Sequence, residues 1–413
     1  MKQQFDCTYL GQGAIFSTNS KENGVNNNEL IIGGTQTGKT TSVVEPKLLY
    51  AQYSSYVIPL VKRTLIQKYE KSLRNKGYLV WDLNITNAYQ SDIGVDLFDY
   101  IQSDEDYYWL AKQLVGNMTI EEFWNNTAIN VLTAEMVFLK CKLGRVQLLD
   151  LLMFHNSIEL DTSKSFLKTS VDDVFKDMMN QYPDNFYLSN WKMIYENAPK
   201  TAACIFSNVS NCLKELANEN IIELANKNKR IQIDQMGDVR TVLFITTSPV
   251  DVQTTQFMNI LYTLLFKTLF KKAQSLVRFR LNVPIQIVCD DFACGSKIPD
   301  IERYISIFSS TGIGVTLLLQ SISQLNSMYN ENAANTILNN CDTVCYTGGM
   351  DISSCQLISR FSNRPFEEIL NLSLGNIIII RRGGYTFLTK RYAIYETIAY
   401  KEMMQQTDQI LEI

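Results

Sequence analysis

Short apolar runs alternate with helix-like stretches over the first hundred residues of the chain. Buried parallel strands show up in a sequence as short, nearly continuous apolar runs, because both faces of such strands are covered. The pattern predicts strands at Leu30–Ile32, Ser55–Ile58 and Tyr78–Leu83, and helices at 41–50 and 61–75. Strands and helices that alternate in this order are typical of a mainly parallel α/β sheet.

The pattern changes between residues 103 and 229, where apolar residues recur at helical spacing. One such series is Phe123, Ala128, Val131, Leu132, Met136 and Leu139. Strand-like runs then return at 239–247, 283–290, 314–319, 343–347 and 376–380, separated by helical stretches, notably 250–273, 300–310 and 351–361. The sequence therefore predicts one α/β domain in two parts, 1–102 and 230–413, interrupted by an inserted all-α domain at 103–229.

The turn after the first strand carries a phosphate-binding pattern. Residues 33–40 fit G-x-x-x-x-G-K-[ST] at every constrained position, between a predicted strand and a predicted helix. Backbone N–H groups of such a loop surround phosphate oxygens, and the helix N-terminus favours their negative charge. The sequence therefore predicts an ATP site with Mg²⁺, in which Lys39 reaches the β- and γ-phosphates and the Thr40 hydroxyl binds the metal. The expected cofactor-binding residues are Gly33, Gly34, Thr35, Gln36, Thr37, Gly38, Lys39, Thr40 and Thr41.

Besides the Thr40 hydroxyl, a carboxylate from another strand is needed to hold the metal. The best candidate follows a later apolar run. Residues 284–289 lead directly into Asp290 and Asp291, which places both carboxylates at the carboxyl end of a strand. Ligands bind at that edge of open parallel sheets. We expect Asp290 to hold Mg²⁺ and Asp291 to orient the attacking water.

Composition narrows the possible functions. The 413 residues and 46% hydrophobic content suffice for two domains with full cores. A net charge of −4 excludes a uniformly basic surface, so any contact with nucleic acid must come from local patches. His155 is the only histidine, which argues against histidine-based catalysis or metal binding and favours a core or surface position.

The cysteines and the apolar segments indicate a cytoplasmic protein. Nine cysteines without a CxxC pair are typical of reduced intracellular thiols. Met1–Tyr9 is polar and does not look like a signal peptide. No run reaches the roughly eighteen apolar residues that a membrane span needs. Association with the inner face of the cell membrane is therefore expected only as a peripheral contact or through partners.

Several sequence blocks follow one another along the chain: Asn26–Gly34, Val44–Pro46, Pro284–Phe292, Lys297–Glu302, Leu319–Leu325, Asn340–Asp342, Gly348–Gly349 and Arg381–Gly383. In this order they resemble the type IV coupling proteins of conjugation and type IV secretion, the TraG/TraD-like group of P-loop motors related to FtsK and HerA. The resemblance covers about residues 26–395 and is weakest in the helical insert.

The resemblance implies more than the residues do by themselves. It implies a RecA-like ATPase with an inserted all-α domain that assembles into a ring, usually a hexamer. It implies a relaxase bound to single-stranded DNA as substrate, and the proteins of a type IV secretion channel as partners. Gln320 matches the glutamine that lies near the γ-phosphate in this family, so the resemblance adds it to Lys39, Asp290 and Asp291 as a catalytic residue.

Three departures from the family pattern bear on the activity. The family usually has Asp-Glu where this chain has Asp290 and Asp291, and the shorter second side chain predicts slow hydrolysis. The family's D-P-K-G-E-like segment corresponds to Leu60–Thr64, which keeps only the lysine. Ser309–Thr311 stand where some members carry an arginine that acts on a neighbour's nucleotide. Arg303, Arg381 and Arg382 remain alternatives for that role.

Two basic clusters are candidates for phosphate contacts with DNA. Their members are Lys62, Arg63, Lys68, Lys71, Arg74 and Lys76, and Lys267, Lys271, Lys272, Arg278 and Arg280. The leading hypothesis is a DNA-coupling ATPase. A family member that recruits protein substrates, and a nucleotide-binding scaffold with weak or no hydrolysis, remain as alternatives.

Overall fold

The fold is described from a computed structural model, which covers residues 4–116, 121–161, 163, 167–248, 254–290, 292, 297–384 and 386–408. The chain forms two compact units. The sheet unit comprises Met1–Thr86, Gln232–Val250 and Leu265–Ile413, and the helical unit comprises Asn87–Ile231 and Asp251–Leu264. Helix α12 (Thr255–Ser275) contributes residues to both.

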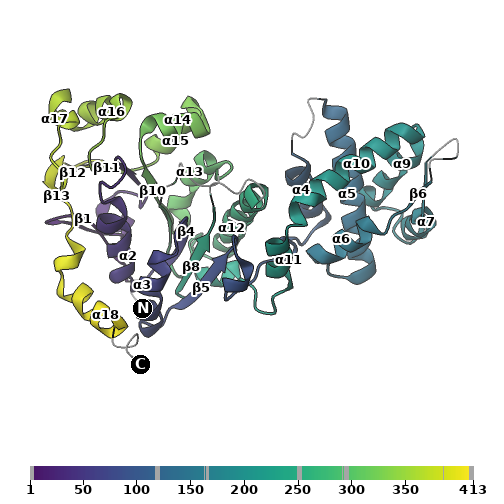
Figure 1. The fold of residues 1–413 in the computed structure, drawn as a ribbon, viewed down its shortest axis with the longest axis horizontal. Helices are drawn as coiled ribbons and strands as arrows, with labels where there is room; N and C mark the ends of the chain where they lie inside the picture. The colour runs from purple at the N-terminus through teal and green to yellow at the C-terminus, as the bar shows by residue number, and fades with distance from the viewer. Residues whose placement is uncertain are drawn as a thin grey trace. The chain divides into compact units, whose positions relative to one another are not determined.

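The sheet unit is built on nine strands in the order β13-β12-β11-β3-β10-β9-β4-β8-β5 (Figure 1). The strands from β11 to β5 are parallel, and β12 and β13 extend the sheet in antiparallel fashion. The bounds are β3 Glu29–Ile32, β4 Ser55–Leu60, β5 Leu79–Asn84, β8 Thr241–Thr246, β9 Ile285–Cys289, β10 Ile313–Leu319, β11 Thr343–Tyr346, β12 Asn376–Arg381 and β13 Phe387–Lys390. The predicted α/β class with a mainly parallel sheet is confirmed.

Helices cover the strands of this sheet. They are α1 Ser20–Asn23, α2 Glu45–Leu49, α3 Thr64–Asn75, α13 Ile301–Thr311, α14 Ile322–Tyr329, α15 Glu331–Asn339, α16 Ile352–Ser362, α17 Phe366–Leu370 and α18 Ile398–Asp408. Helix α3 buries Leu65, Ile66, Tyr69 and Leu73, which recur at helical spacing and join the same apolar core as Ile58 of β4. A hairpin of β1 Cys7–Gly11 and β2 Ala14–Ser17 adds Leu10 to that core.

A buried ion pair ties the phosphate-loop strand to the helix that follows it. Glu29 begins β3 and lies 2.9 Å from the Lys47 Nζ in α2. The Thr316 hydroxyl of β10 also donates to Glu29, at 2.8 Å. Both charged side chains are about 5% exposed. Their mutual contact and the Thr316 hydroxyl give the buried carboxylate and ammonium group the partners that they lose with water. This pair fixes the two elements that flank the phosphate loop.

The helical unit is almost entirely α-helical, with one two-residue ribbon, β6 Leu160–Asp161 and β7 Lys168–Thr169, that is too short to show in a periodicity. Its helices are α4 Asp104–Val115, α5 Glu122–Leu143, α6 Leu148–Asn156, α7 Asp172–Gln181, α8 Phe186–Ser189, α9 Met193–Glu196, α10 Pro199–Leu216 and α11 Glu219–Asn226. Short 3₁₀ turns complete the described elements of the chain, at Ala88–Gln90, Leu97–Tyr100, Asn190–Lys192, Ile233–Gly237 and Ile394–Glu396.

His155 lies in the core of the helical unit, where it joins three helices. Its Nδ1 lies 3.0 Å from a carboxylate oxygen of Glu135 in α5, and its Nε2 lies 2.8 Å from the Ser210 hydroxyl oxygen in α10. Burial raises the pKa of Glu135, and the bond to His155 opposes that shift. Ser210 also bonds to the carbonyl of Phe206 within its own helix, 3.1 Å away, so the three side chains tie helices together.

Candidate nucleotide site

The phosphate loop leaves β3 at Gly33 and enters a π-helical turn at Thr40 (Thr40–Val44), which runs directly into α2. Gly38 has φ of +77°, a left-handed conformation that glycine adopts without strain. A Cβ at Gly33 would collide with the Thr347 hydroxyl that follows β11. These two glycines therefore occupy positions that a larger residue would distort, as the motif predicts.

The loop is anchored on the neighbouring strand. The Gly34 N–H donates to the Gly348 carbonyl at 2.8 Å, and the hydroxyls of Thr37 and Thr347 lie 2.8 Å apart. The loop therefore keeps a defined shape without a ligand. Thr35 and Gln36 at its tip are exposed, and Gln36 takes a positive φ of 60°.

Lys39 lies folded back along the loop rather than reaching into solvent. Its side chain is buried, and its Nζ donates to the carbonyl oxygens of Gly33 at 2.5 Å and Gly34 at 2.9 Å. The ammonium group therefore stays beside the concave backbone where the motif predicts bound phosphate. In this position the ammonium group offsets the partial negative charge of the Gly33 and Gly34 carbonyl oxygens, which would otherwise repel a bound phosphate.

Thr40 and Asp290, the predicted metal-binding pair, lie in contact although they are 250 positions apart in the sequence. The Thr40 hydroxyl lies 2.8 and 3.0 Å from the two carboxylate oxygens of Asp290, at the end of β9. One hydroxyl and one carboxylate fit a nucleotide-bound Mg²⁺, which takes its remaining ligands from phosphates and water. Among the residues that the structure describes, no cluster of three or more His, Cys, Asp or Glu side chains could hold a metal ion without a nucleotide.

Strand order explains how the remaining candidates are positioned. Strand β10 lies between β3 and β9, with Leu319 paired with Ile32 and Leu317 paired with Cys289. Gln320 therefore follows β10 beside Gly33, whose N–H donates to the Leu319 carbonyl at 3.1 Å. Sequence reasoning placed Asp290 and Gln320 on separate strands, and the register brings both strand ends to the phosphate-loop edge. Asp291 lies outside the described residues.

A cleft that the motifs do not predict opens beside the start of the helix. It has a volume of about 420 Å³ and is lined by Thr41, Ser42, Gln12 and residues of the segment 390–396. This segment starts at Lys390, the last residue of β13. A single arginine and two tyrosines in an irregular stretch give no recognisable signal in a sequence, so only the fold reveals the cleft.

Comparison with known proteins assigns the chain to a family. The family model described as type IV secretory system conjugative DNA transfer matches residues 3–361. The chain belongs to this family. The resemblance stated from the sequence motifs is thereby confirmed. No curated protein matches the chain.

Solved structures of TrwB and VirB4 share the fold of this chain. The plasmid coupling protein TrwB in complex with the GTP analogue GDPNP superimposes with a TM-score of 0.63 at 17% identity, over 88% of this chain and 85% of that chain. TrwB has also been solved with ADP and Mg²⁺, with a TM-score of 0.61 at 16% identity and the same coverage. VirB4 of Thermoanaerobacter pseudethanolicus gives 0.57 at 11% identity, over 95% and 97% of the two chains.

The three candidate arginines for action on a neighbour's nucleotide differ in how they are held. Arg382 pairs with Asp342 at 3.0 Å, and the Arg381 guanidinium lies 4.1 Å from the centre of the Phe16 ring. Arg303 has an 80% exposed side chain, and its only ion pair among the described residues is with Asp300, at 3.9 Å. Of the three arginines, Arg303 is therefore the best placed to contact a second molecule.

Most of the first basic cluster is engaged within the sheet unit. Arg63 pairs with Asp82, Lys68 with Glu45 and Arg74 with Glu70, and Lys71 and Lys76 donate to backbone carbonyls. In the second cluster, Lys272 lies 2.6 Å from Asp238. Lys62 and Arg278 are exposed and make no ion pair within the described part of the chain. These two residues are the better candidates for phosphate contacts.

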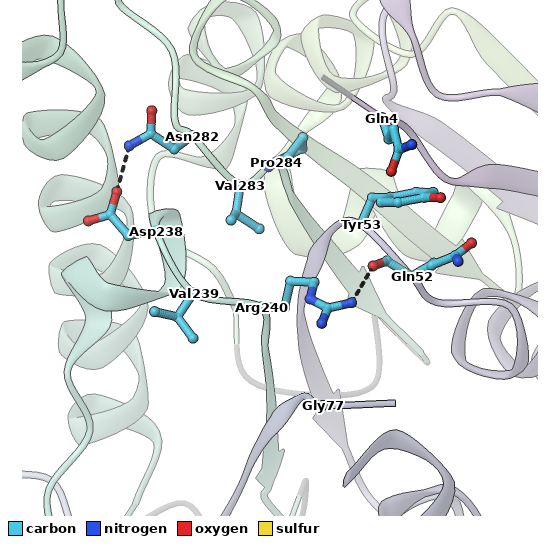
Figure 2. A pocket seen from close by; sticks show the side chains of 10 residues that line it. All are labelled: Gln4, Gln52, Tyr53, Gly77, Asp238, Val239, Arg240, Asn282, Val283 and Pro284. Atoms are coloured by element: carbon cyan, nitrogen blue, oxygen red, sulfur yellow. Dashed lines mark hydrogen bonds between the residues drawn. The ribbon is translucent and has the colours of Figure 1, made fainter. Parts of the chain in front are cut away.

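A larger pocket of about 560 Å³ lies at the opposite, amino-terminal edge of the sheet (Figure 2). Figure 2 shows Tyr53 and Arg240 facing this pocket, with Arg240 donating to the Gln52 carbonyl at 2.8 Å. Parallel sheets bind ligands at their carboxyl edge, where the phosphate loop lies, so this pocket is not the nucleotide site. Within the described residues, no helix is both long and apolar enough to cross a membrane.

Proposed function

We propose that this chain is the ATP-driven coupling motor of a conjugative or type IV secretion system, and that it drives relaxase-bound single-stranded DNA toward the transfer channel. The observation that carries the proposal is the contact of Thr40 with Asp290, made at the phosphate loop of a chain from the conjugative DNA transfer family. This contact supports a metal-binding pair beside the phosphate loop, at one edge of the sheet.

We assign the roles of Lys39, Thr40 and Asp290 from their positions, and those of Asp291 and Gln320 from the sequence motifs. Backbone N–H groups of residues 33–41 bind the phosphates, and the Lys39 ammonium exchanges its two carbonyl partners for β- and γ-phosphate oxygens. Thr40 and Asp290 hold Mg²⁺, which when bound offsets negative charge on the β- and γ-phosphates. Asp291 orients the attacking water, and the Gln320 amide bonds both water and a phosphate oxygen, because it carries a donor and an acceptor.

The assembly that performs this work is a homo-oligomeric ring, with the helical stretch 103–229 as an inserted all-α domain. In a ring, one subunit's nucleotide lies against its neighbour, and the exposed Arg303 is the residue we assign to that contact. A ring also multiplies a weak DNA contact by the number of subunits, so a few cations such as Lys62 and Arg278 suffice for each protomer. We place the chain at the cytoplasmic face of the membrane, in peripheral association through channel proteins.

Measurement of ATP turnover with and without single-stranded DNA tests the proposal. The motor predicts Mg²⁺-dependent turnover that single strands stimulate and that Lys39→Ala abolishes. ATP binding without turnover, at protein concentrations where the ring assembles, would instead support a nucleotide-binding scaffold. Turnover that a relaxase or another protein substrate stimulates, but DNA does not, would support recruitment of protein.

A further inference from the structure

The segment that closes the 420 Å³ cleft is held in place by the sheet. We call residues 387–396, which comprise β13 and the turn Ile394–Glu396, the C-terminal strap. The Arg391 N–H donates to the Gly375 carbonyl at 2.8 Å, and the Lys390 carbonyl accepts from the Gln12 N–H at 2.9 Å. The Thr389 hydroxyl also donates to the Gln12 carbonyl at 2.9 Å. These bonds join the strap to β12 and to the first hairpin, so its position is fixed without a ligand.

Arg391 extends from the strap onto the phosphate loop. Its Cζ lies 3.1 Å from the point that a Cβ of Gly38 would occupy, and the Thr41 hydroxyl oxygen lies 3.3 Å from the same point. Gly38 is thus needed here for a second reason, since any side chain at this position would overlap the guanidinium group. The cation lies where the loop turns into the helix.

The guanidinium group of Arg391 makes no hydrogen bond or ion pair in the part of the chain that the structure describes. Its residue is nevertheless half-buried. Several other partly buried cations of the sheet unit are paired, as Lys68 is with Glu45 and Lys272 is with Asp238. A planar group with five donors matches phosphate oxygens in geometry and charge. An unpaired arginine against a phosphate loop therefore points to an anionic ligand.

The cleft beside Arg391 offers a different chemistry. Thr41 and Ser42 form its side toward the loop, and Tyr392 and Tyr395 lie on the strap side. The Tyr392 hydroxyl bonds to that of Tyr50 at 3.0 Å, and the Tyr395 hydroxyl donates to Glu45 at 3.2 Å. Both rings are thus held at their polar ends. Aromatic faces bind a nucleobase by stacking, and the volume falls in the usual range of pockets for small ligands.

We propose that the C-terminal strap forms the nucleoside half of the nucleotide site. Arg391 binds a phosphate of the nucleotide held by its own chain, and the cleft between Thr41 and Tyr395 holds the ribose and the base. The inference rests on the proposed nucleotide-driven function, because it takes the phosphate loop as the site of the triphosphate. It assigns the strap a contact that none of the sequence motifs contains.

Two ligands allow the phosphate half and the nucleoside half of the site to be tested separately. Displacement of a fluorescent ATP analogue by ATP and by inorganic tripolyphosphate, both with Mg²⁺, gives an affinity for the whole nucleotide and for its phosphates. Arg391→Ala should weaken both ligands about tenfold or more, as expected for loss of a charged hydrogen bond. Tyr395→Ala should weaken ATP severalfold and leave tripolyphosphate unchanged. Arg360→Ala serves as the matched control, since this exposed arginine lies on another element, α16, and has no assigned contact with the nucleotide.

The outcomes distinguish the strap from the proposed function. If Lys39→Ala loses ATP while Arg391→Ala binds both ligands like the wild type, the strap assignment is wrong and the nucleotide site stands. If Lys39→Ala keeps full affinity, the proposed function itself fails.

A measurement on the unmodified protein avoids any effect of substitution on folding. Phenylglyoxal modifies accessible arginines, and mass spectrometry locates the adducts. Mg·ATP should protect Arg391 and leave the exposed Arg360 reactive. Equal modification of Arg391 with and without saturating Mg·ATP would overturn the proposal.

Discussion

Replacement of Lys39 by alanine tests the phosphate loop most directly, and the structure predicts two separate effects. The first is on the unliganded protein. The Lys39 Nζ donates to the carbonyls of Gly33 and Gly34, and the side chain is only 7% exposed. A hydrogen bond from a charged group is worth about 1.5–3 kcal/mol. Since water can replace part of this at the half-buried Gly34, we expect a loss of about 1–2 kcal/mol in the free energy of unfolding.

The second effect is on ligand-induced stabilisation. A ligand at 100 times its dissociation constant stabilises the native state by about 2.7 kcal/mol. Wild type should show this gain with Mg·ATP, and Lys39→Ala should show almost none at the same concentration. The two effects are separated because the first appears without nucleotide and the second only with it.

Chemical denaturation of both proteins, with and without Mg·ATP, measures the four free energies. Thr35→Ala is the matched control: it changes an exposed side chain in the same loop and keeps the backbone N–H groups. It should retain the nucleotide-induced gain. The reasoning is refuted if Lys39→Ala gains as much stability from Mg·ATP as the wild type does.

Three further predictions concern other parts of the molecule. Asp291→Asn should stop hydrolysis while Mg·ATP stays bound, Asp291→Glu should raise the rate, and unchanged turnover in the first variant would remove the residue from the mechanism. Asp351 caps α16 by accepting from a backbone N–H and a serine hydroxyl, so Asp351→Ala should cost about 1 kcal/mol in denaturation at neutral pH. Burial raises the pKa of Asp351, but its hydrogen bonds lower the pKa more, so the pKa lies below the usual value of an aspartate. The cap therefore contributes its full stability above that usual pKa, and the contribution is lost as the pH falls through the lowered pKa of the folded state. In anisotropy titrations with single strands, Arg278→Glu should weaken binding and flatten the salt slope more than Lys272→Glu, because Lys272 already pairs with Asp238.

Local signals in the sequence accounted for most of the fold and for which strand ends carry the candidate site. Strands β3 and β9 are short apolar runs that end in the phosphate loop and at Asp290, so the positions of these strands could be predicted. The predicted helix at 61–75 begins instead at Thr64, because β4 continues to Leu60 and the chain turns before the helix starts. The spacing of apolar residues predicts that a helix is present, but it locates the first and last residues of the helix only to within a few positions.

Contacts between distant segments account for what the sequence did not predict. The cations of α3 form an apparent basic face in sequence, yet Arg63 and Lys68 meet carboxylates of Asp82 and Glu45 that fold beside them. Arg391 likewise has no motif around it, and its position against Gly38 depends on the antiparallel addition of β12 and β13 to the sheet. A pattern of apolar residues predicts elements, but it does not specify which side chains meet across them.

The placement of the C-terminal strap has a consequence for how the protein is made. Synthesis proceeds from the N-terminus, so the phosphate loop leaves the ribosome well before the residues that close the cleft beside Thr41. A nascent or C-terminally shortened chain therefore presents the loop without its strap. On the assignment proposed above, a chain that has not yet added the strap can hold the phosphates of a nucleotide but lacks the half of the site that holds the nucleoside.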